Sequence, residues 1–257
     1  MNSLDFDKLG TAKIYNKARS FPPETWKMWR KVLLTSVPKK EISLMVDLGC
    51  GTGRFLNFLE KTFSCKIIAI DPSKKMLAEA RKKIKNNHKI KLIQAPAEQI
   101  PLKDNSVDMV FISLAFHTFN NPNKAVAEVK RILKPGGYAV IRQPTKETNR
   151  LDQGLKLLPE SLRLSKILVI TRKQMFAVWK KQGFIKFKHH IVKQKVTKTC
   201  REFYERVSLR GASIYKLIPD KIFNKRLDKL KHYCGSLKRE HPIYEMRELF
   251  VFKKPKL

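Results

Sequence analysis

Val46-Asp47-Leu48-Gly49-Cys50-Gly51-Thr52-Gly53 is the stretch that decides the fold of this 257-residue chain. A short apolar run, residues 44–46, leads into it, and an amphipathic stretch begins near Arg54. This order predicts a buried strand, a tight turn and a helix. Glycine at alternate positions lets the backbone turn sharply and approach a ligand, because no Cβ occupies that space. Open parallel sheets bind ligands at the carboxyl ends of their strands, so we expect a binding site here.

Short apolar runs alternate with amphipathic stretches along the rest of the chain, which predicts a parallel sheet with crossover helices. We expect strands near residues 44–48, 66–70, 90–94, 107–112, 138–142, 184–192 and 249–252. Ser73 can cap one helix. Asn121 and Pro122 can begin another, which Pro135-Gly136-Gly137 would end before the next strand.

Two segments lie outside this alternation. Residues 1–40 contain Phe21-Pro22-Pro23 and then Trp26, Trp29, Val32 and Leu33, whose spacing predicts an amphipathic helix that could cover a pocket. Residues from about 196 to 245 separate the last two strands and include a Lys-rich helix with Phe223, Leu227 and Leu230 on one face. We therefore expect a helical cap before the sheet and a helical insertion before the last strand.

The composition is that of a globular protein, with 42% hydrophobic and 30% charged residues. No apolar run is long enough to span a membrane, and residues 1–20 lack the features of a secretory signal, so we expect a cytoplasmic protein. The cysteines Cys50, Cys65, Cys200 and Cys234 have no zinc-site spacing, which predicts free thiols and no metal site. His189 and His190 are expected to be exposed on a sheet edge.

The net charge of +33 has two interpretations. It could attract nucleic acid or anionic ligands. It could also reflect lysines that coat solvated helix faces, because they are spread along the chain and form no long block. The oligomeric state is not predicted.

The glycine loop departs from a dinucleotide-binding motif, because Arg54 stands where the third glycine would be. The arrangement of Asp47, Gly49, Gly51 and Gly53 resembles instead the first motif of class I S-adenosylmethionine-dependent methyltransferases. Downstream, the apolar strand Ile68-Ala69-Ile70-Asp71 ends in a carboxylate. An aspartate there often caps a helix or turn, but after this loop we expect it to accept hydrogen bonds from the ribose hydroxyls.

Two further stretches extend the resemblance. Ala97-Glu98-Gln99-Ile100-Pro101-Leu102 resembles the family's adenine-side loop, and Arg131-Ile132-Leu133-Lys134-Pro135-Gly136-Gly137-Tyr138 its turn into the fifth strand. The chain departs from the family at Pro96, where an acid is frequent and where Glu98 or Gln99 could substitute. Together, residues 44–142 resemble the ubiquinone/menaquinone-biosynthesis-like branch, methyltransferase type 11.

The resemblance implies an α/β fold. This is a Rossmann-like three-layer sandwich with a mostly parallel seven-stranded sheet, its last strand antiparallel, with the helical cap and the helical insertion. We expect one methyltransferase domain over residues 1–257, made of the cap (1–40), a cofactor-binding half (41–145) and a substrate-side half (146–257).

The resemblance also implies S-adenosylmethionine as cofactor. The residues expected to bind it are Tyr15, Arg19, Asp47, Gly49, Cys50, Gly51, Gly53, Asp71, Pro72, Met76, Ala97, Glu98 and Ser113. His117 follows the fourth strand and is the candidate general base. Aromatic residues expected to line an acceptor pocket are Phe116, Phe119, Phe203, Tyr204 and Tyr215.

The predicted activity is methyl transfer to a small-molecule acceptor by in-line displacement, in which the enzyme acts mainly by alignment. Two alternatives stay open. One is methyl transfer to RNA, such as tRNA, which rests chiefly on the charge. The other is a non-catalytic protein of the same fold that binds the cofactor or nucleic acid, since fold alone does not establish turnover.

Overall fold

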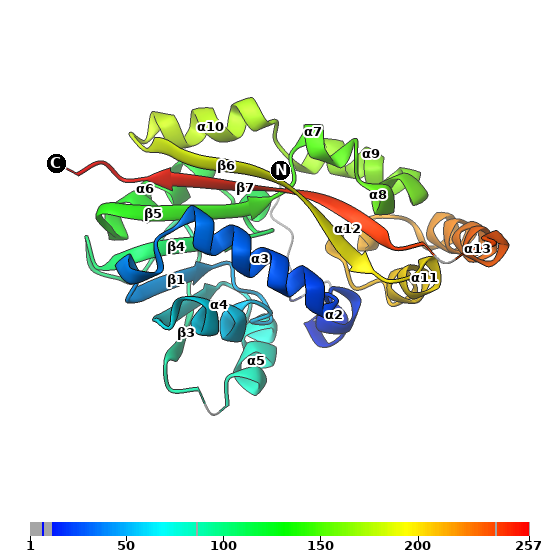
Figure 1. The fold of residues 1–257 in the computed structure, drawn as a ribbon, viewed down its shortest axis with the longest axis horizontal. Helices are drawn as coiled ribbons and strands as arrows, with labels where there is room; N and C mark the ends of the chain where they lie inside the picture. The colour runs from blue at the N-terminus through cyan, green and yellow to red at the C-terminus, as the bar shows by residue number, and fades with distance from the viewer. Residues whose placement is uncertain (1–6, 8–11, 86, 240, 257) are drawn as a thin grey trace.

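A seven-stranded sheet forms the centre of the computed structural model, which describes residue 7 and residues 12–85, 87–239 and 241–256 (Figure 1). The strands are β1 (Leu44–Leu48), β2 (Lys66–Asp71), β3 (Ile90–Gln94), β4 (Val107–Ser113), β5 (Leu133–Gln143), β6 (Ile185–Thr197) and β7 (Ile243–Lys253). Their order is β3-β2-β1-β4-β5-β7-β6. β1 to β5 pair in parallel, and β7 runs antiparallel to both β5 and β6. The predicted sheet is thus confirmed.

Two strands begin earlier than predicted: β7 begins at Ile243 instead of near residue 249, and β5 begins before a predicted turn. The sequence places a turn at Pro135-Gly136-Gly137 before the fifth strand, but β5 already begins at Leu133. Leu133 pairs with Val107 and Tyr138 pairs with Met109, so the register shifts between these two pairs. The turn residues therefore form an irregularity within β5. Local turn signals could not show this, because the pairing of Leu133 depends on β4.

Helices cover both faces of the sheet. The helices before β6 are α2 (Ala12–Ala18), α3 (Pro23–Ser36), η1 (Lys39–Glu41), α4 (Leu56–Phe63), α5 (Lys74–Lys83), η2 (Phe116–Thr118), α6 (Pro122–Ile132), α7 (Lys146–Asn149), α8 (Gln153–Leu157), α9 (Pro159–Leu168) and α10 (Arg172–Lys181). Apolar residues of α3, α4 and α5 pack on one face, and those of α6 and α10 pack on the other. The amphipathic helix predicted around Trp26 and Trp29 is α3, and Trp29 is fully buried.

The predicted helix starts are also confirmed. The Ser73 side chain accepts a hydrogen bond from the Met76 N–H at 3.1 Å, and the Asn121 side chain accepts one from the Lys124 N–H at 3.0 Å. Each bond satisfies an amide that the first turn of a helix leaves without an intrahelical partner.

A lobe with its own apolar core projects from one end of the sheet (Figure 1). The long strands β6 and β7 extend into it, and between them lie α11 (Cys200–Ser208), α12 (Ser213–Lys216) and α13 (Asp220–Ser236). This is the predicted helical insertion. Phe223 and Leu230 of α13 are buried in the lobe core, as their spacing predicts.

The prediction that all four cysteines are free thiols is wrong for two of them. Cys200 of α11 and Cys234 of α13 form a disulfide, whereas Cys50 and Cys65 are free and buried. The packing of α11 against α13 brings the two Cα atoms within 5.3 Å. Thirty-four residues separate the two cysteines, so their proximity is a tertiary feature that spacing does not show.

The edge position predicted for His189 and His190 is correct, because β6 is the last strand of the sheet. Their exposure is not, since both side chains have partners. His189 Nε2 lies 2.6 Å from the buried Glu248 carboxylate, and His190 Nε2 lies 3.1 Å from Ser36 Oγ. Within the described part of the chain, no helix combines the length and the hydrophobicity that crossing a bilayer requires.

Candidate active site

Gly49 and Gly51, two of the glycines in the loop after β1, have different roles. Both adopt left-handed backbone angles, with φ of 73° at Gly49 and 54° at Gly51. A Cβ at Gly49 would lie 2.4 Å from the Ala115 Cβ, so this position needs glycine for close packing of the loop against the segment after β4. A Cβ at Gly51 would meet open space. Gly51 is therefore the position at which a side chain would enter the space above the loop.

Asp71, the last residue of β2, holds the glycine loop in place. Its Oδ2 accepts a hydrogen bond from the Gly51 N–H at 2.8 Å, and its Oδ1 accepts one from the Ser73 N–H at 2.9 Å. A carboxylate oxygen can accept more than one hydrogen bond, so both oxygens keep acceptor capacity. Burial raises the pKa of Asp71, while the two backbone hydrogen bonds lower it.

Asp47 lies beneath the same loop and is buried. Burial, together with the nearby Asp71 carboxylate, raises the pKa of its carboxyl to about 8. Two carboxyl groups at one site therefore differ in environment, because Asp71 has backbone donors to stabilise its charge. A positively charged group placed beside Asp47 would favour its ionised form.

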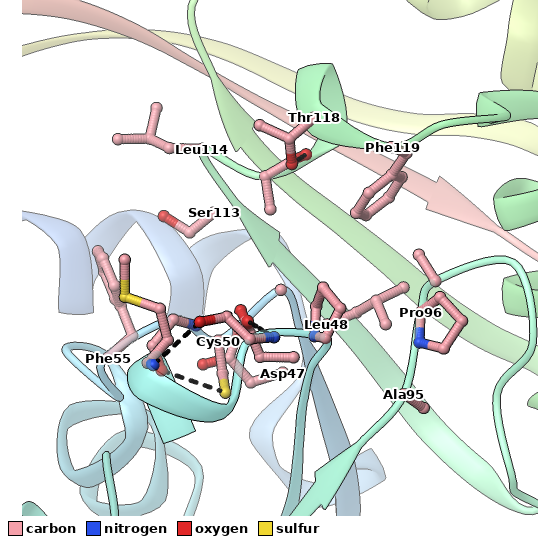
Figure 2. A pocket seen from close by; sticks show the side chains of 18 of the residues that line it. Asp47, Leu48, Cys50, Phe55, Ala95, Pro96, Ser113, Leu114, Thr118 and Phe119 are labelled. Carbon is pink, nitrogen blue, oxygen red and sulfur yellow. Dashed lines mark hydrogen bonds between the residues drawn. The ribbon is translucent and has the colours of Figure 1, made fainter. Parts of the chain in front are cut away.

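A cavity of about 320 Å³ opens over this loop, at the carboxyl ends of β1 to β4. We call it the cofactor cavity. Figure 2 shows Asp47 and Cys50 on one side and Ala95 and Pro96 from the segment after β3 on another. The end of β4 and the segment after it contribute Ser113, Leu114, Thr118 and Phe119. The predicted cofactor-binding residues that line it are Tyr15, Asp47, Gly49, Cys50, Gly51, Asp71, Pro72, Met76, Ala97, Glu98 and Ser113.

Two predicted residues lie elsewhere. Gly53 is not part of this lining; a Cβ there would meet Leu56 and Ala80 at about 3 Å, so it packs against α5. Arg19 lines two neighbouring cavities instead. Of the proposed adenine-side substitutes, Glu98 lines the cofactor cavity but also accepts a hydrogen bond from the Asn121 N–H at 3.0 Å.

Cys50 is a lining residue whose thiol stays protonated. Burial raises its pKa well above the ordinary value, and the Asp47 and Asp71 carboxylates add to the effect. A nucleophilic cysteine needs the opposite shift. Cys50 therefore contributes shape to the cavity.

His117 lies in the short helix η2 and lines a second cavity of about 120 Å³. Burial lowers the pKa of its imidazole to about 4, so the ring is neutral at pH 7. A neutral ring can accept a proton or a hydrogen bond, although a pKa this low makes it a weak base. Tyr15 lines both this cavity and the cofactor cavity.

The predicted aromatic lining is correct in part. Phe203 and Tyr215 line the second cavity, and Phe119 lines the cofactor cavity. Phe116 is instead buried with its ring centroid 6.0 Å from that of Trp179, and Tyr204 packs against the lobe core. Phe116 and Tyr204 therefore pack against other side chains and line neither of these two cavities.

Leu114 was not predicted and is the residue that the cavities share. It lines the cofactor cavity, the second cavity and a third, smaller one. Its φ is 56°, a left-handed angle that is uncommon for a residue with a branched side chain. Strained backbone of this kind is concentrated at functional sites. No sequence signal marks it, because the conformation results from packing around the end of β4.

Comparisons with known proteins agree with this architecture. Residues 46–141 match a family described as a methyltransferase domain. The chain is 35% identical over 150 residues to a demethylmenaquinone methyltransferase of Staphylococcus carnosus, covering 57% of this chain and 58% of the relative. It is 39% identical over 109 residues to a malonyl-[acyl-carrier protein] O-methyltransferase of Marinomonas sp., covering 42% of this chain and 40% of the relative. The chain thus spans about half the length of these relatives.

A solved structure gives the same picture at the level of the fold. An S-adenosylmethionine-dependent methyltransferase from Aquifex aeolicus superposes with a TM-score of 0.57 at 25% identity, covering 72% of this chain and 92% of that one. The glycine loop and Asp71 at the end of β2 both lie within the matched segment, residues 46–141. Residues 46–141 thus match a methyltransferase domain, and the relatives similar to this chain include a demethylmenaquinone methyltransferase and a ubiquinone/menaquinone biosynthesis C-methyltransferase.

Proposed function

We propose that this protein transfers a methyl group from S-adenosylmethionine to a small-molecule acceptor. One observation carries the proposal: the cofactor cavity and the second cavity meet at Leu114. A donor in the first cavity and an acceptor in the second would face each other across this residue. The volume of the second cavity, about 120 Å³, fits a small acceptor better than a polymer.

The residues around the cofactor cavity suit this donor. Asp71 retains acceptor capacity on both oxygens, which is what two ribose hydroxyls need. Asp47 offers a carboxyl group to a cationic ligand, and the open space at Gly51 leaves room for the ligand beside the backbone. Pro96 and Ala97 would lie on the adenine side.

When bound, the donor supplies a methyl group that its sulfonium sulfur already activates for displacement. The chain then needs mainly to hold the acceptor in line, which can contribute about 7–11 kcal/mol to the barrier reduction in favourable cases. His117 is placed on the acceptor side, where its neutral ring can accept a hydrogen bond from the acceptor or take up its proton. Under this proposal His117 is the general base, and alignment of the acceptor contributes more to the rate than proton transfer does.

The acceptor does not follow from the relatives. One relative's name gives demethylmenaquinone and another gives malonyl-[acyl-carrier protein]. Methyl transfer to RNA is the alternative that the net charge of +33 suggests. The cytoplasmic location also stays a proposal. Disulfides such as Cys200–Cys234 are rare in reducing compartments, so cell fractionation is the direct measurement.

Methyl-labelled S-adenosylmethionine and fractionated cell extract test the proposal. The fractions are small molecules, protein and total RNA, the last with and without ribonuclease. We expect label in a small-molecule fraction with the wild type and none with Asp71→Ala, which loses the ribose acceptor. Label confined to ribonuclease-sensitive material would overturn the small-molecule acceptor in favour of RNA. Donor binding without label in any fraction would indicate the non-catalytic alternative.

A further inference from the structure

The third cavity lies beside the other two and is lined by four arginines, Arg19, Arg54, Arg142 and Arg206. We call it the arginine niche. Its volume is about 30 Å³. A single water molecule needs a cavity volume of about 10–15 Å³, so the niche has room for about two oxygen atoms. Leu114 borders both the niche and the cofactor cavity.

Arg142 is the most deeply placed of the four. It extends from β5 and is fully buried. Its guanidinium carbon lies 4.6 Å from the ring centroid of Trp29 and 5.2 Å from that of Phe55. Its two terminal nitrogens donate to the neutral oxygens of Ser113 and Gln194. Its Nε has no hydrogen-bond partner among the residues that the structure describes. This fully buried guanidinium thus donates to no carboxylate, and Glu245 acts on it only through space, without a hydrogen bond.

The other groups around the niche do not balance the positive charge of Arg142. Arg54 donates to the Arg19 carbonyl, and Arg206 donates to the carbonyls of Ser20 and Val196. Glu245 is the carboxylate within the described lining of the niche. It is shared, since Oε1 lies 3.7 Å from Arg19 and Oε2 lies 2.5 Å from Arg247, outside the niche. Positive charge therefore exceeds negative charge here.

This excess has an energetic consequence. Burying an ionised group without a partner is costly, and the protein or a ligand must compensate it. Burial lowers the pKa of Arg142, and the positive charges of Arg54 and Arg247 lower it further. An anion between the arginines would relieve both effects. Arginine forks match the two oxygens of a carboxylate in particular.

We infer that the arginine niche binds a carboxylate of the methyl acceptor, so that the substrate is a small carboxylic acid. This rests on the proposed function. The niche and the second cavity share Leu114, Phe203 and Tyr215, so a ligand can extend from one into the other. Leu155, Leu168 and Ile214 are apolar residues that line the second cavity and would contact an alkyl portion of the ligand.

A carboxylate could also come from the donor's methionine part, because Arg54 borders both the cofactor cavity and the niche. Arg142 and Arg206 line the niche but not the cofactor cavity. A variant of either residue therefore separates the two sources. Donor affinity should respond if the niche serves the donor, and acceptor affinity should respond if it serves the acceptor.

The experiment uses calorimetry on the full chain saturated with S-adenosylhomocysteine. Hexanoate is the probe, and hexanol is its uncharged counterpart. The variants are Arg142→Met, Arg142→Lys and Arg206→Met, with Arg150→Met at an exposed position as the control. We expect wild type to bind hexanoate about tenfold or more tightly than hexanol, which corresponds to about 1.4 kcal/mol. We expect Arg142→Met and Arg206→Met to lose this preference, and Arg142→Lys to keep part of it.

Three results would overturn the inference. One is equal affinity of the wild type for hexanoate and hexanol. Another is loss of S-adenosylhomocysteine affinity in Arg142→Met or Arg206→Met while hexanoate binding persists, which would assign the niche to the donor. The third is retained preference in both variants. If Arg142→Met does not fold, Arg206→Met decides. Failure of S-adenosylhomocysteine to bind the wild type would instead contradict the proposed function, so the two failures are distinguishable.

Discussion

The wall of the cofactor cavity and the wall of the arginine niche meet at Leu114 but are built differently. Most of the cofactor cavity comes from segments that directly follow β1 to β4, and the glycine loop contributes its backbone. The niche is lined by side chains from positions as distant as Arg19, Arg142 and Glu245. A main-chain site is set by local conformation, whereas a side-chain site depends on how distant elements pack. The first can be common to a family while the second differs between its members.

The largest expected effect tests the glycine loop, whose backbone forms part of the cofactor cavity. Gly51→Val should abolish measurable S-adenosylmethionine binding, because its Cβ would enter the open space of the cofactor cavity and its left-handed backbone would be strained. Calorimetry on folded protein is the measurement. Gly49→Val is the matched control: its side chain would strike Ala115, so we expect it to lower the melting temperature first. Equal donor affinity in Gly51→Val and wild type would show that the loop does not form the site.

The next effect concerns the cluster of side chains around Glu248. Glu248 is fully buried, lies 2.6 Å from both Arg172 Nε and His189 Nε2, and accepts a hydrogen bond from Thr145. Glu248→Ala should lower the free energy of unfolding by about 1–3 kcal/mol, because it removes the acceptor of the buried Thr145 hydroxyl and of the partly exposed Arg172 and His189 side chains. Denaturant unfolding measures this, with the exposed-site variant Arg150→Met as reference. A loss below 1 kcal/mol would mean that this cluster contributes little.

The smallest effect is the pH dependence of donor binding. The pKa of Asp47 is raised to about 8 in the free protein, and a cationic donor beside it should lower that pKa. Binding then releases a proton, so affinity should rise with pH up to about 8 and level off above it. The slope cannot exceed about tenfold per pH unit, equivalent to about 1.4 kcal/mol. Titrations from pH 6 to 9 check this, and Asp47→Asn should flatten the profile. A flat profile in the wild type would remove Asp47 from the site.

Much of the cofactor half is predictable because its signals are local. Asp47, Gly51 and Asp71 stand at strand ends that the apolar runs already mark, and parallel strands bring those ends to one edge. Even here the roles of the glycines are not separable from sequence. Only the position of Ala115 shows that Gly49 is needed for packing, and only the open space shows that Gly51 faces the cavity.

The succession of strands along the chain, the helix starts at Ser73 and Asn121 and the glycine turn were determined by the sequence itself, since each depends on neighbouring residues. Tertiary structure alone decided the strained backbone of Leu114, the gathering of four arginines and the Cys200–Cys234 disulfide. These features join residues far apart in the chain. Their energies depend on burial and on distances across the packed core, and neither quantity is encoded in residue spacing.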